Sequence, residues 1–154
     1  MFHIILFQPE IPPNTGNIIR LCANTGAQLH LIKPLGFFFD DKRLVRAGLD
    51  YHEFATVQLH EDYEAFVARV APPRVFAFTT KAEAGYAETA FRPGDALLFG
   101  PETRGLPAKI LGALPEGHRL RIPMRPESRS LNLSNAVALV LFEAWRQNGF
   151  AGAG

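Results

Sequence analysis

Short apolar segments alternate along this chain with longer segments of helical periodicity, and this alternation restricts the possible folds more than any other sequence feature. Segment 96–100, Ala-Leu-Leu-Phe-Gly, is typical of a central parallel strand that is covered on both faces. The same patterns predict strands at residues 2–8, 28–33, 56–59, 74–80, 96–100 and 119–124, and helices at 15–25, 41–47, 62–71, 107–114 and 133–147. This order predicts a doubly wound α/β fold, in which helices cover both faces of a parallel sheet.

The length of 154 residues fits a single domain, residues 1–154, with one core. Capping residues support the predicted helices. Asp40 and Asp62 are suitable N-caps, and Gly26 and Gly48 stand where a residue that ends a helix is favoured. We expect the C-terminal residues 149–154 to fray.

Composition and charge restrict the function only weakly. Apolar residues make up 47% and charged residues 20% of the chain, as in an ordinary globular protein. The net charge of +1 gives RNA binding little support, since nucleic-acid-binding domains are often more basic. Cys22 is the chain's one cysteine, which excludes an internal disulfide and fits a reducing compartment. No apolar stretch approaches the length of a membrane span, so we expect a cytoplasmic protein that has no membrane partner.

Three chemically unusual segments, 9–17, 100–107 and 122–135, each follow a predicted strand. Because α/β sheets bind ligands beyond the carboxyl ends of their strands, these segments are expected to lie around one site. They contain neither a G-x-G-x-x-G nor a P-loop motif, which argues against a dinucleotide or phosphate-loop site. Backbone groups in such loops can recognise a neutral purine, and Gly100 would let the ligand approach the backbone closely. Taken singly, the same glycines and prolines can equally be turn formers.

Metal and hydrolase chemistry are not expected. The five histidines lie far apart in the sequence and lack the spacing of metal ligands, so no metal site is predicted. Ser130 stands outside the G-x-S-x-G context that a serine hydrolase needs.

Arg20 shares the polar face of a predicted helix with Asn17 and Asn24. It is either an ordinary surface arginine or a contact for RNA phosphate or ribose. The same choice between solvated surface and RNA contact applies to two groups of basic residues. The first group is Lys42, Arg43 and Arg46, and the second is Arg119, Arg121, Arg125 and Arg129. Residues 37–39, Phe-Phe-Phe, can pack in the core or stack on a base.

The last predicted helix, 133–147, is apolar around nearly its whole circumference. A helix of this kind must be buried on more than one side. Either a second subunit covers it, which predicts a homodimer, or the helix is central within the monomer.

Three sequence motifs in these segments are typical of a known family. Residues 14–20 read Asn-Thr-Gly-Asn-Ile-Ile-Arg, residues 98–107 read Leu-Phe-Gly-Pro-Glu-Thr-Arg-Gly-Leu-Pro, and residues 122–136 contain Ile-Pro-Met and Ser-Arg-Ser-Leu-Asn-Leu-Ser-Asn-Ala. In this order they resemble motifs one, two and three of the SPOUT methyltransferases. The likeness is closest to the bacterial tRNA (cytidine/uridine-34) 2′-O-methyltransferases of the TrmL type, and it covers essentially the whole chain.

The resemblance implies a SPOUT-type α/β domain with a trefoil knot in its C-terminal part, assembled as a homodimer. It also implies methylation of the wobble nucleotide of tRNA, C34 or U34, on its ribose 2′-hydroxyl. S-adenosyl-L-methionine would be the cofactor and S-adenosyl-L-homocysteine the product, without a metal. Two alternatives stay open: a SPOUT ribose methyltransferase that acts on ribosomal RNA or another tRNA position, and an RNA-binding protein without catalysis.

The resemblance also assigns roles by position. Catalysis is assigned to Arg20 and Asn132, and RNA binding to Asn14, Arg20 and Arg129. Cofactor binding is assigned to Phe78, Thr79, Gly100, Ile122, Met124, Ser130, Leu131 and Leu133. Two residues depart from the family pattern: Phe78 replaces an expected aliphatic residue, and Phe142 replaces an expected tyrosine.

The mechanism that the resemblance implies gives Arg20 the activation of the ribose hydroxyl. Because an arginine side chain stays protonated in proteins, we expect Arg20 to fix the adjacent phosphate and orient the hydroxyl instead of accepting its proton. Asn132 and Ser130 would position the ribose or the cofactor, and Glu102 would have a structural role in accepting hydrogen bonds from loop amides.

Overall fold

A computed structural model describes residues 1–39 and 49–154 of the chain. The predicted helix at 41–47 lies outside the described residues, together with Asp40, Gly48 and the basic group Lys42, Arg43 and Arg46.

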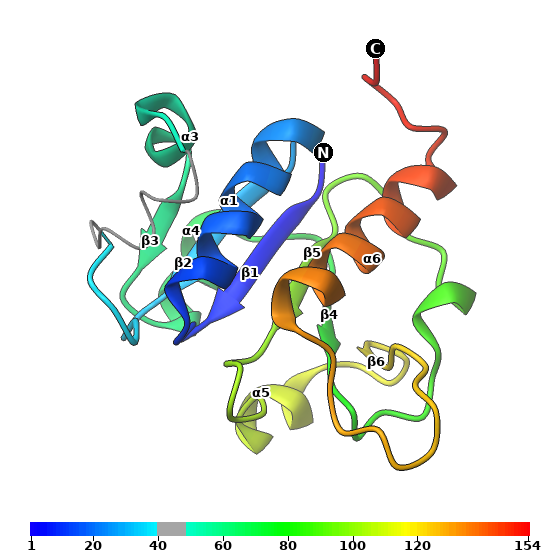
Figure 1. The fold of residues 1–154 in the computed structure, drawn as a ribbon. Coiled ribbons are helices and arrows are strands. Elements are labelled where there is room, and N and C mark those ends of the chain that lie inside the picture. Colours follow the sequence, from blue (N-terminus) through cyan, green and yellow to red (C-terminus); the bar gives the residue numbers. More distant parts are fainter. Residues whose placement is uncertain (40–48) are drawn as a thin grey trace.

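In the described part of the chain, six parallel strands form one sheet in the order β3-β2-β1-β5-β4-β6, as Figure 1 shows. The strands are β1 (His3–Phe7), β2 (Gln28–Ile32), β3 (Gln58–His60), β4 (Val75–Phe78), β5 (Ala96–Phe99) and β6 (Arg119–Leu120). The predicted α/β class and parallel sheet are therefore confirmed. The largest difference is in β6, which ends at Leu120 because beyond it only an isolated bridge joins Arg121 to Gly85.

The helices are α1 (Pro12–Thr25), α3 (Tyr51–Ala55), α4 (Tyr63–Val70), α5 (Ala108–Ala113) and α6 (Leu133–Gln147), with a 3-10 turn η1 (Tyr86–Glu88). The bounds of α6 agree with the prediction, and Asp62 caps α4 through its side chain as expected. The predicted start of α1 at residue 15 is wrong, because the helix includes two prolines in its first turn, where their missing N–H groups cost nothing. The short elements α3 and η1 were not predicted.

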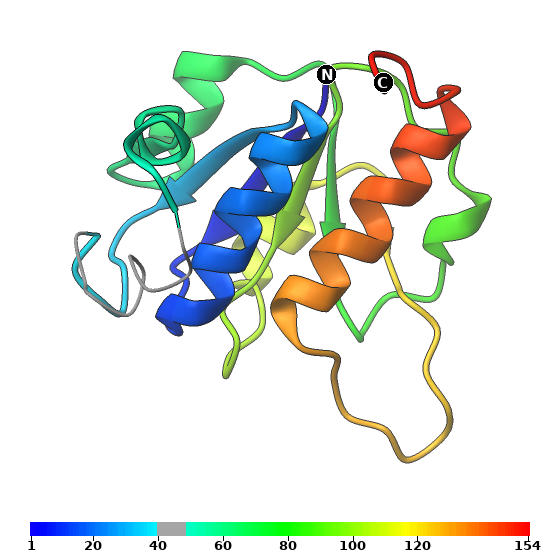
Figure 2. The same ribbon diagram turned by 45° about the horizontal axis from the view of Figure 1, so that its top comes forward.

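The sheet has one core on each face. Helices α1 and α6 lie side by side on one face, where Ile4 and Leu6 of β1 pack with Ile18 and Val137 (Figures 1 and 2). On the other face, alternate residues of the central strands pack with α4 and α5 in a second core cluster. The central strands are thus covered on both sides, which is why they are apolar at successive positions.

Cys22 belongs to the core of the α1 face and is 4% exposed. Burial raises the pKa of its thiol to about 12, so the side chain is an uncharged packing group and not a nucleophile.

Three histidines that are far apart in the sequence form a hydrogen-bonded row across β1, β2 and β3. The ring of His30 contacts His3 and His60 through its two nitrogens, at 2.9 Å each. Burial, followed by the charges of His3, His60 and Arg69, lowers the pKa of His30 to about 3. Among the described residues, no group of His, Cys, Asp and Glu side chains is arranged to hold a metal ion.

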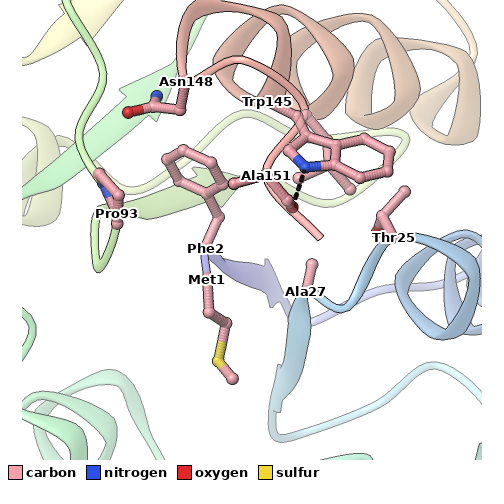
Figure 3. Close-up of a pocket in the computed structure, with 9 residues that line it drawn as sticks. Met1, Phe2, Thr25, Ala27, Pro93, Trp145, Asn148 and Ala151 are labelled. Carbon is pink, nitrogen blue, oxygen red and sulfur yellow. Dashed lines mark hydrogen bonds between the residues drawn. The ribbon is translucent and has the colours of Figure 1, made fainter. Parts of the chain in front are cut away.

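The C-terminal residues turn back beside the end of α6, where Figure 3 shows a small cavity of about 70 Å³. The indole of Trp145 donates a hydrogen bond to the carbonyl of Ala151 at 2.9 Å, and Phe150 packs edge-on against the same ring. This cavity lies near the amino ends of the strands, beside Phe2 and Ala27, and it has room for only a few water molecules. None of the helices in the described ranges is long and apolar enough to cross a membrane.

Candidate cofactor and RNA site

A cavity of about 550 Å³ lies at the carboxyl ends of the strands, in the size range of small-ligand sites. The loops that follow β1, β4, β5 and β6 meet there, together with the first turn of α6; they occupy the lower edge of Figures 1 and 2. All eight residues that the family resemblance assigns to the cofactor line this cavity: Phe78, Thr79, Gly100, Ile122, Met124, Ser130, Leu131 and Leu133. Asn14, Arg129 and Asn132 line it too.

The wall of the cavity contains two stacked aromatic rings. Phe78 ends β4 and Phe99 ends β5; the two are paired in the sheet, and their rings lie 4.8 Å apart at an angle of 9°. Ile122 and Met124 add apolar surface, while the loop backbones and the hydroxyl groups of Thr79 and Ser130 are polar. A flat, neutral, hydrogen-bonding group such as a purine fits this combination.

Gly100 lines the cavity and is also tightly packed against the rest of its own loop. A Cβ atom there would lie 3.0 Å from the backbone nitrogen of Leu106 and 3.2 Å from its Cγ. The glycine therefore lets the loop at 100–106 close upon itself, and the close approach of a ligand at Gly100 stays a prediction.

Glu102 joins the loop after β5 to the start of α1. Its carboxylate accepts hydrogen bonds from the backbone N–H groups of Glu10 and Ile11, both at 2.8 Å, and from the side-chain amide of Asn14 at 3.3 Å. Ile11 is the N-cap of α1 and has no capping side chain of its own, so Glu102 supplies the acceptor from 91 residues away. The expected structural role of Glu102 agrees with this geometry.

Glu10, in the loop before α1, accepts hydrogen bonds from the loop after β5. Its carboxylate accepts from the backbone N–H of Thr103 at 2.9 Å and from the Thr103 hydroxyl at 2.7 Å, and Arg104 lies 3.5 Å away. The hydrogen bonds from Thr103, with Arg104 adding to them, lower the pKa of Glu10. Two carboxylates thus hold the first and second motif loops together.

Asn132 connects the third motif loop to the other two. Its side-chain amide donates to the side-chain oxygen of Asn14 at 3.0 Å, while its own oxygen caps α6 by accepting from the backbone N–H groups of Ser134 and Asn135. The side-chain oxygens of Asn14 and Asn132 are therefore both engaged within the protein. This geometry gives both residues a role in holding the loops together, while the catalytic role of Asn132 and the RNA contact of Asn14 stay predictions.

Arg20 does not line the cavity of its own chain. It lies on the exposed face of α1, six residues and about 9 Å of helical rise beyond Asn14. Its guanidinium forms two hydrogen bonds of 3.3 Å with Glu53, which a capping box with Asp50 holds at the start of α3. The three loops converge as expected, but Arg20 is not among the residues of its own protomer that line the space they enclose.

Two basic residues of the cavity were missed as site residues. Lys81 follows β4, and Arg104 lies within the second motif; both line the cavity and are exposed. Their positions in segments that follow predicted strands could have indicated that they belong to the site. With Arg129 they give the cavity a basic rim.

The last helix is only partly covered by its own domain. Its buried side is formed by Leu133, Val137, Val140, Leu141 and Ala144. Leu139 and Phe142 remain 45% and 43% exposed. The monomer therefore leaves an apolar side of α6 open to solvent.

Comparisons with known proteins agree with this site. A model of the SpoU rRNA Methylase family matches residues 1–142. The tRNA (cytidine(34)-2′-O)-methyltransferase of Escherichia coli strain K12 is 62% identical over 153 residues, which cover 99% of this chain and 98% of that protein. A solved structure described as giving structural insights into the 2-OH methylation of C/U34 on tRNA has a TM-score of 0.88 and 49% identity, and 97% of each chain is covered.

A more distant solved structure contains the cofactor. The AdoMet-bound rRNA methyltransferase of Sinorhizobium meliloti has a TM-score of 0.81 and 29% identity, with 94% of this chain and 56% of that chain covered. The match over nearly the full length, together with the convergence of three motif loops on one cavity, shows that the chain belongs to the SpoU rRNA methylase family of SPOUT methyltransferases.

Proposed function

We propose that this protein transfers the methyl group of S-adenosyl-L-methionine to the ribose 2′-hydroxyl of nucleotide 34 of tRNA, a cytidine or a uridine, in the cytoplasm. The observation that carries the proposal is the convergence of the three motif loops around one cavity. The 62% identity with an E. coli enzyme of that name supports the same substrate.

The cavity suits the adenosyl part of this cofactor. The stacked rings of Phe78 and Phe99 and the side chains of Ile122 and Met124 provide apolar contact, and Ser130 and the loop backbones provide hydrogen-bonding groups. The cofactor bound to the related S. meliloti enzyme supports this assignment. When bound, its sulfonium supplies a methyl group that is already activated for transfer to an oxygen nucleophile.

Arg20 would act on the RNA. A guanidinium binds phosphate through a rigid fork of N–H donors and stays charged at neutral pH. By holding the phosphate beside nucleotide 34, Arg20 would align the 2′-hydroxyl for attack, and the proton would leave to phosphate or water. Alignment of this kind can contribute several kcal/mol to the lowering of the barrier.

The protein would act as a homodimer that pairs through α6, with Arg20 of one protomer serving the cavity of its partner. Leu139 and Phe142 form an exposed apolar side on α6, and α1 with Arg20 runs beside that helix (Figure 2). A second protomer packed against α6 would place its own α1 near the cavity, which accounts for the exclusion of Arg20 from the cavity of its own chain.

Mixed dimers test this arrangement in trans. Arg20→Ala removes the guanidinium, and Ala136→Phe fills the cavity, which Ala136 lines. Each variant alone should lose methyl transfer, whereas a mixed dimer should recover part of it, because the intact Arg20 of one protomer then faces the intact cavity of the other. Inactive mixed dimers, or R20A with full activity, would contradict the arrangement.

The C-terminal part of the chain would carry the trefoil knot that is typical of the family. Mechanical stretching between the two termini tests this directly. A knotted chain should reach a contour length shorter than an open chain of 154 residues allows. A full contour length would exclude the knot.

The experiment that tests the reaction is mass-spectrometric mapping of ribose methylation in whole RNA that has been incubated with the protein and isotope-labelled cofactor. The label should appear on C34 or U34 of tRNA. Label on ribosomal RNA or another tRNA position would favour the first alternative, and RNA binding without any label would favour a non-catalytic protein.

A further inference from the structure

Phe38 is the most exposed large apolar side chain among the described residues, with 82% of its surface open to solvent. Its two neighbours behave differently, because Phe37 and Phe39 are partly buried and pack against the core. The ring of Phe39 lies edge-on to Phe54 at 5.7 Å. The packing of these two partly buried neighbours holds the backbone on both sides of Phe38, whose ring is left in solvent.

The loop that carries Phe38 is docked on the loop after β1. The backbone N–H of Gly36 donates to the carbonyl of Pro9 at 2.9 Å. A Cβ atom at Gly36 would lie 2.8 Å from the Cα of Glu10, so the two backbones are in the closest contact that a glycine permits. Glu10 in turn holds Thr103 at the cavity, so Phe38 belongs to a continuous set of contacts that reaches the cavity rim.

The loop of Phe38 also shares an edge of the sheet with the proposed site. Its loop follows the carboxyl end of β2, at the same edge of the sheet as the cavity loops (Figures 1 and 2). Phe39, the next residue, contacts Phe54, and the adjacent Glu53 binds Arg20. The segment that carries the exposed ring therefore contacts α3 through Phe39 and the loop after β1 through Gly36.

We propose that Phe38 is a stacking platform for an unpaired base of the RNA substrate, a base next to the nucleotide that is methylated. Single-stranded loops present unstacked bases, and proteins bind such bases on aromatic side chains. A phenylalanine side chain has only two rotatable bonds, so its ring stacks on a base with little loss of conformational entropy. This inference rests on the proposed function, because it takes an RNA loop as the substrate.

The test compares variants of Phe38 in the full-length protein. Phe38→Ala should raise the KM for tRNA, or for an anticodon stem-loop, by about five- to 150-fold, which is the range measured for loss of one base–aromatic stack. The kcat, the cofactor Kd and the melting temperature should stay near the wild-type values. Phe38→Trp should keep RNA binding, and Phe38→Leu should lose it nearly as fully as alanine does, because a leucine is apolar but does not stack.

Phe150→Ala is the matched control, since Phe150 is 42% exposed and lies in the C-terminal segment at the opposite edge of the sheet. A stem-loop that carries 2-aminopurine beside the target nucleotide should lose fluorescence on binding the wild type and not on binding F38A. An unchanged KM in F38A, full function in F38L, or a change of oligomeric state in F38A would overturn the proposal. If the wild type binds the stem-loop with quenching but transfers no methyl group, the stacking inference holds and the proposed function fails.

Discussion

Acidification should destabilise the fold through the buried histidine row, and His30 allows the effect to be calculated. His30 is 1% exposed, and its pKa falls from 6.5 to about 3 on folding. The unfolded chain therefore binds a proton that the folded chain does not, so stability is complete above pH 6.5 and declines as the pH falls below it. At pH 5 the unfolded His30 is almost fully protonated and the folded one is not, which lowers the free energy of unfolding by about 2 kcal/mol.

The charged groups around His30, and the carboxylates elsewhere whose pKa is lowered, act in the same direction or at lower pH. Burial also lowers the pKa values of His3 and His60, and the positive charge of Arg69 lies on the facing helix α4. The carboxylates Glu10 and Glu143 have lowered pKa values and contribute only below about pH 4.5. Between pH 7.5 and 5 the histidine row should therefore dominate.

Urea unfolding followed by circular dichroism at pH 7.5 and at pH 5 measures this loss, which corresponds to a fall in melting temperature of about 4–8 °C for a chain of this size. His30→Leu should remove most of the pH dependence, whatever it does to the stability at pH 7.5. Val67→Ala, at an exposed residue of α4 that does not titrate, is the control and should leave the dependence intact. Equal pH dependence in H30L and the wild type would refute the reasoning.

Three further predictions concern the site and the open side of α6. Glu102→Gln should lower the free energy of unfolding by about 1–2 kcal/mol and weaken cofactor binding in calorimetry. The reason is that an amide cannot replace both oxygens that accept from the N–H groups of Glu10 and Ile11. Glu116→Gln, at an exposed site, is the control and should change neither quantity. Asn132→Ala should lower the free energy of unfolding by about 1 kcal/mol, because the α6 cap is lost. Asn132→Asp should keep the cap and lose only the hydrogen bond that Asn132 donates to Asn14. Identical stability and activity in the two variants would contradict a role of Asn132 in both the cap and the bond to Asn14. Leu139→Glu combined with Phe142→Glu should convert dimers to monomers, as measured by sedimentation. Val67→Glu, at an exposed apolar residue of α4, is the control and should leave the dimer intact. An unchanged sedimentation coefficient in the double variant would place the interface elsewhere.

The sequence predicted those parts of the fold that depend on local periodicity. The six strands and α6 are apolar at the positions that the two cores require, and Asp62 and Gly26 mark helix ends through local backbone chemistry. The short helix α3 could not be predicted from periodicity, since it has five residues and depends on the Asp50–Glu53 capping box.

Features that depend on contacts between distant segments could not be predicted from local periodicity or capping residues. The histidine row arises from the register of three strands, and the bonds of Glu102 with Glu10 and Ile11 span more than ninety residues. The family resemblance identified the residues that converge on the cavity, because motif order carries tertiary information that periodicity does not. Helical periodicity correctly placed Arg20 on an exposed face, but it could not show that Arg20 is not among the residues that line the cavity of the same chain.

Methyl NMR titration with S-adenosyl-L-methionine tests the central claim most directly, because labelled methyl groups report where the cofactor binds. The methyl signals of Ile122, Met124, Leu131 and Leu133 should shift at stoichiometric cofactor, since these side chains line the large cavity. Leu141, beside the small cavity at the opposite edge, should not respond. Shifts centred on Leu141, or none at Ile122 and Met124, would contradict the claim that the three motif loops form the cofactor site.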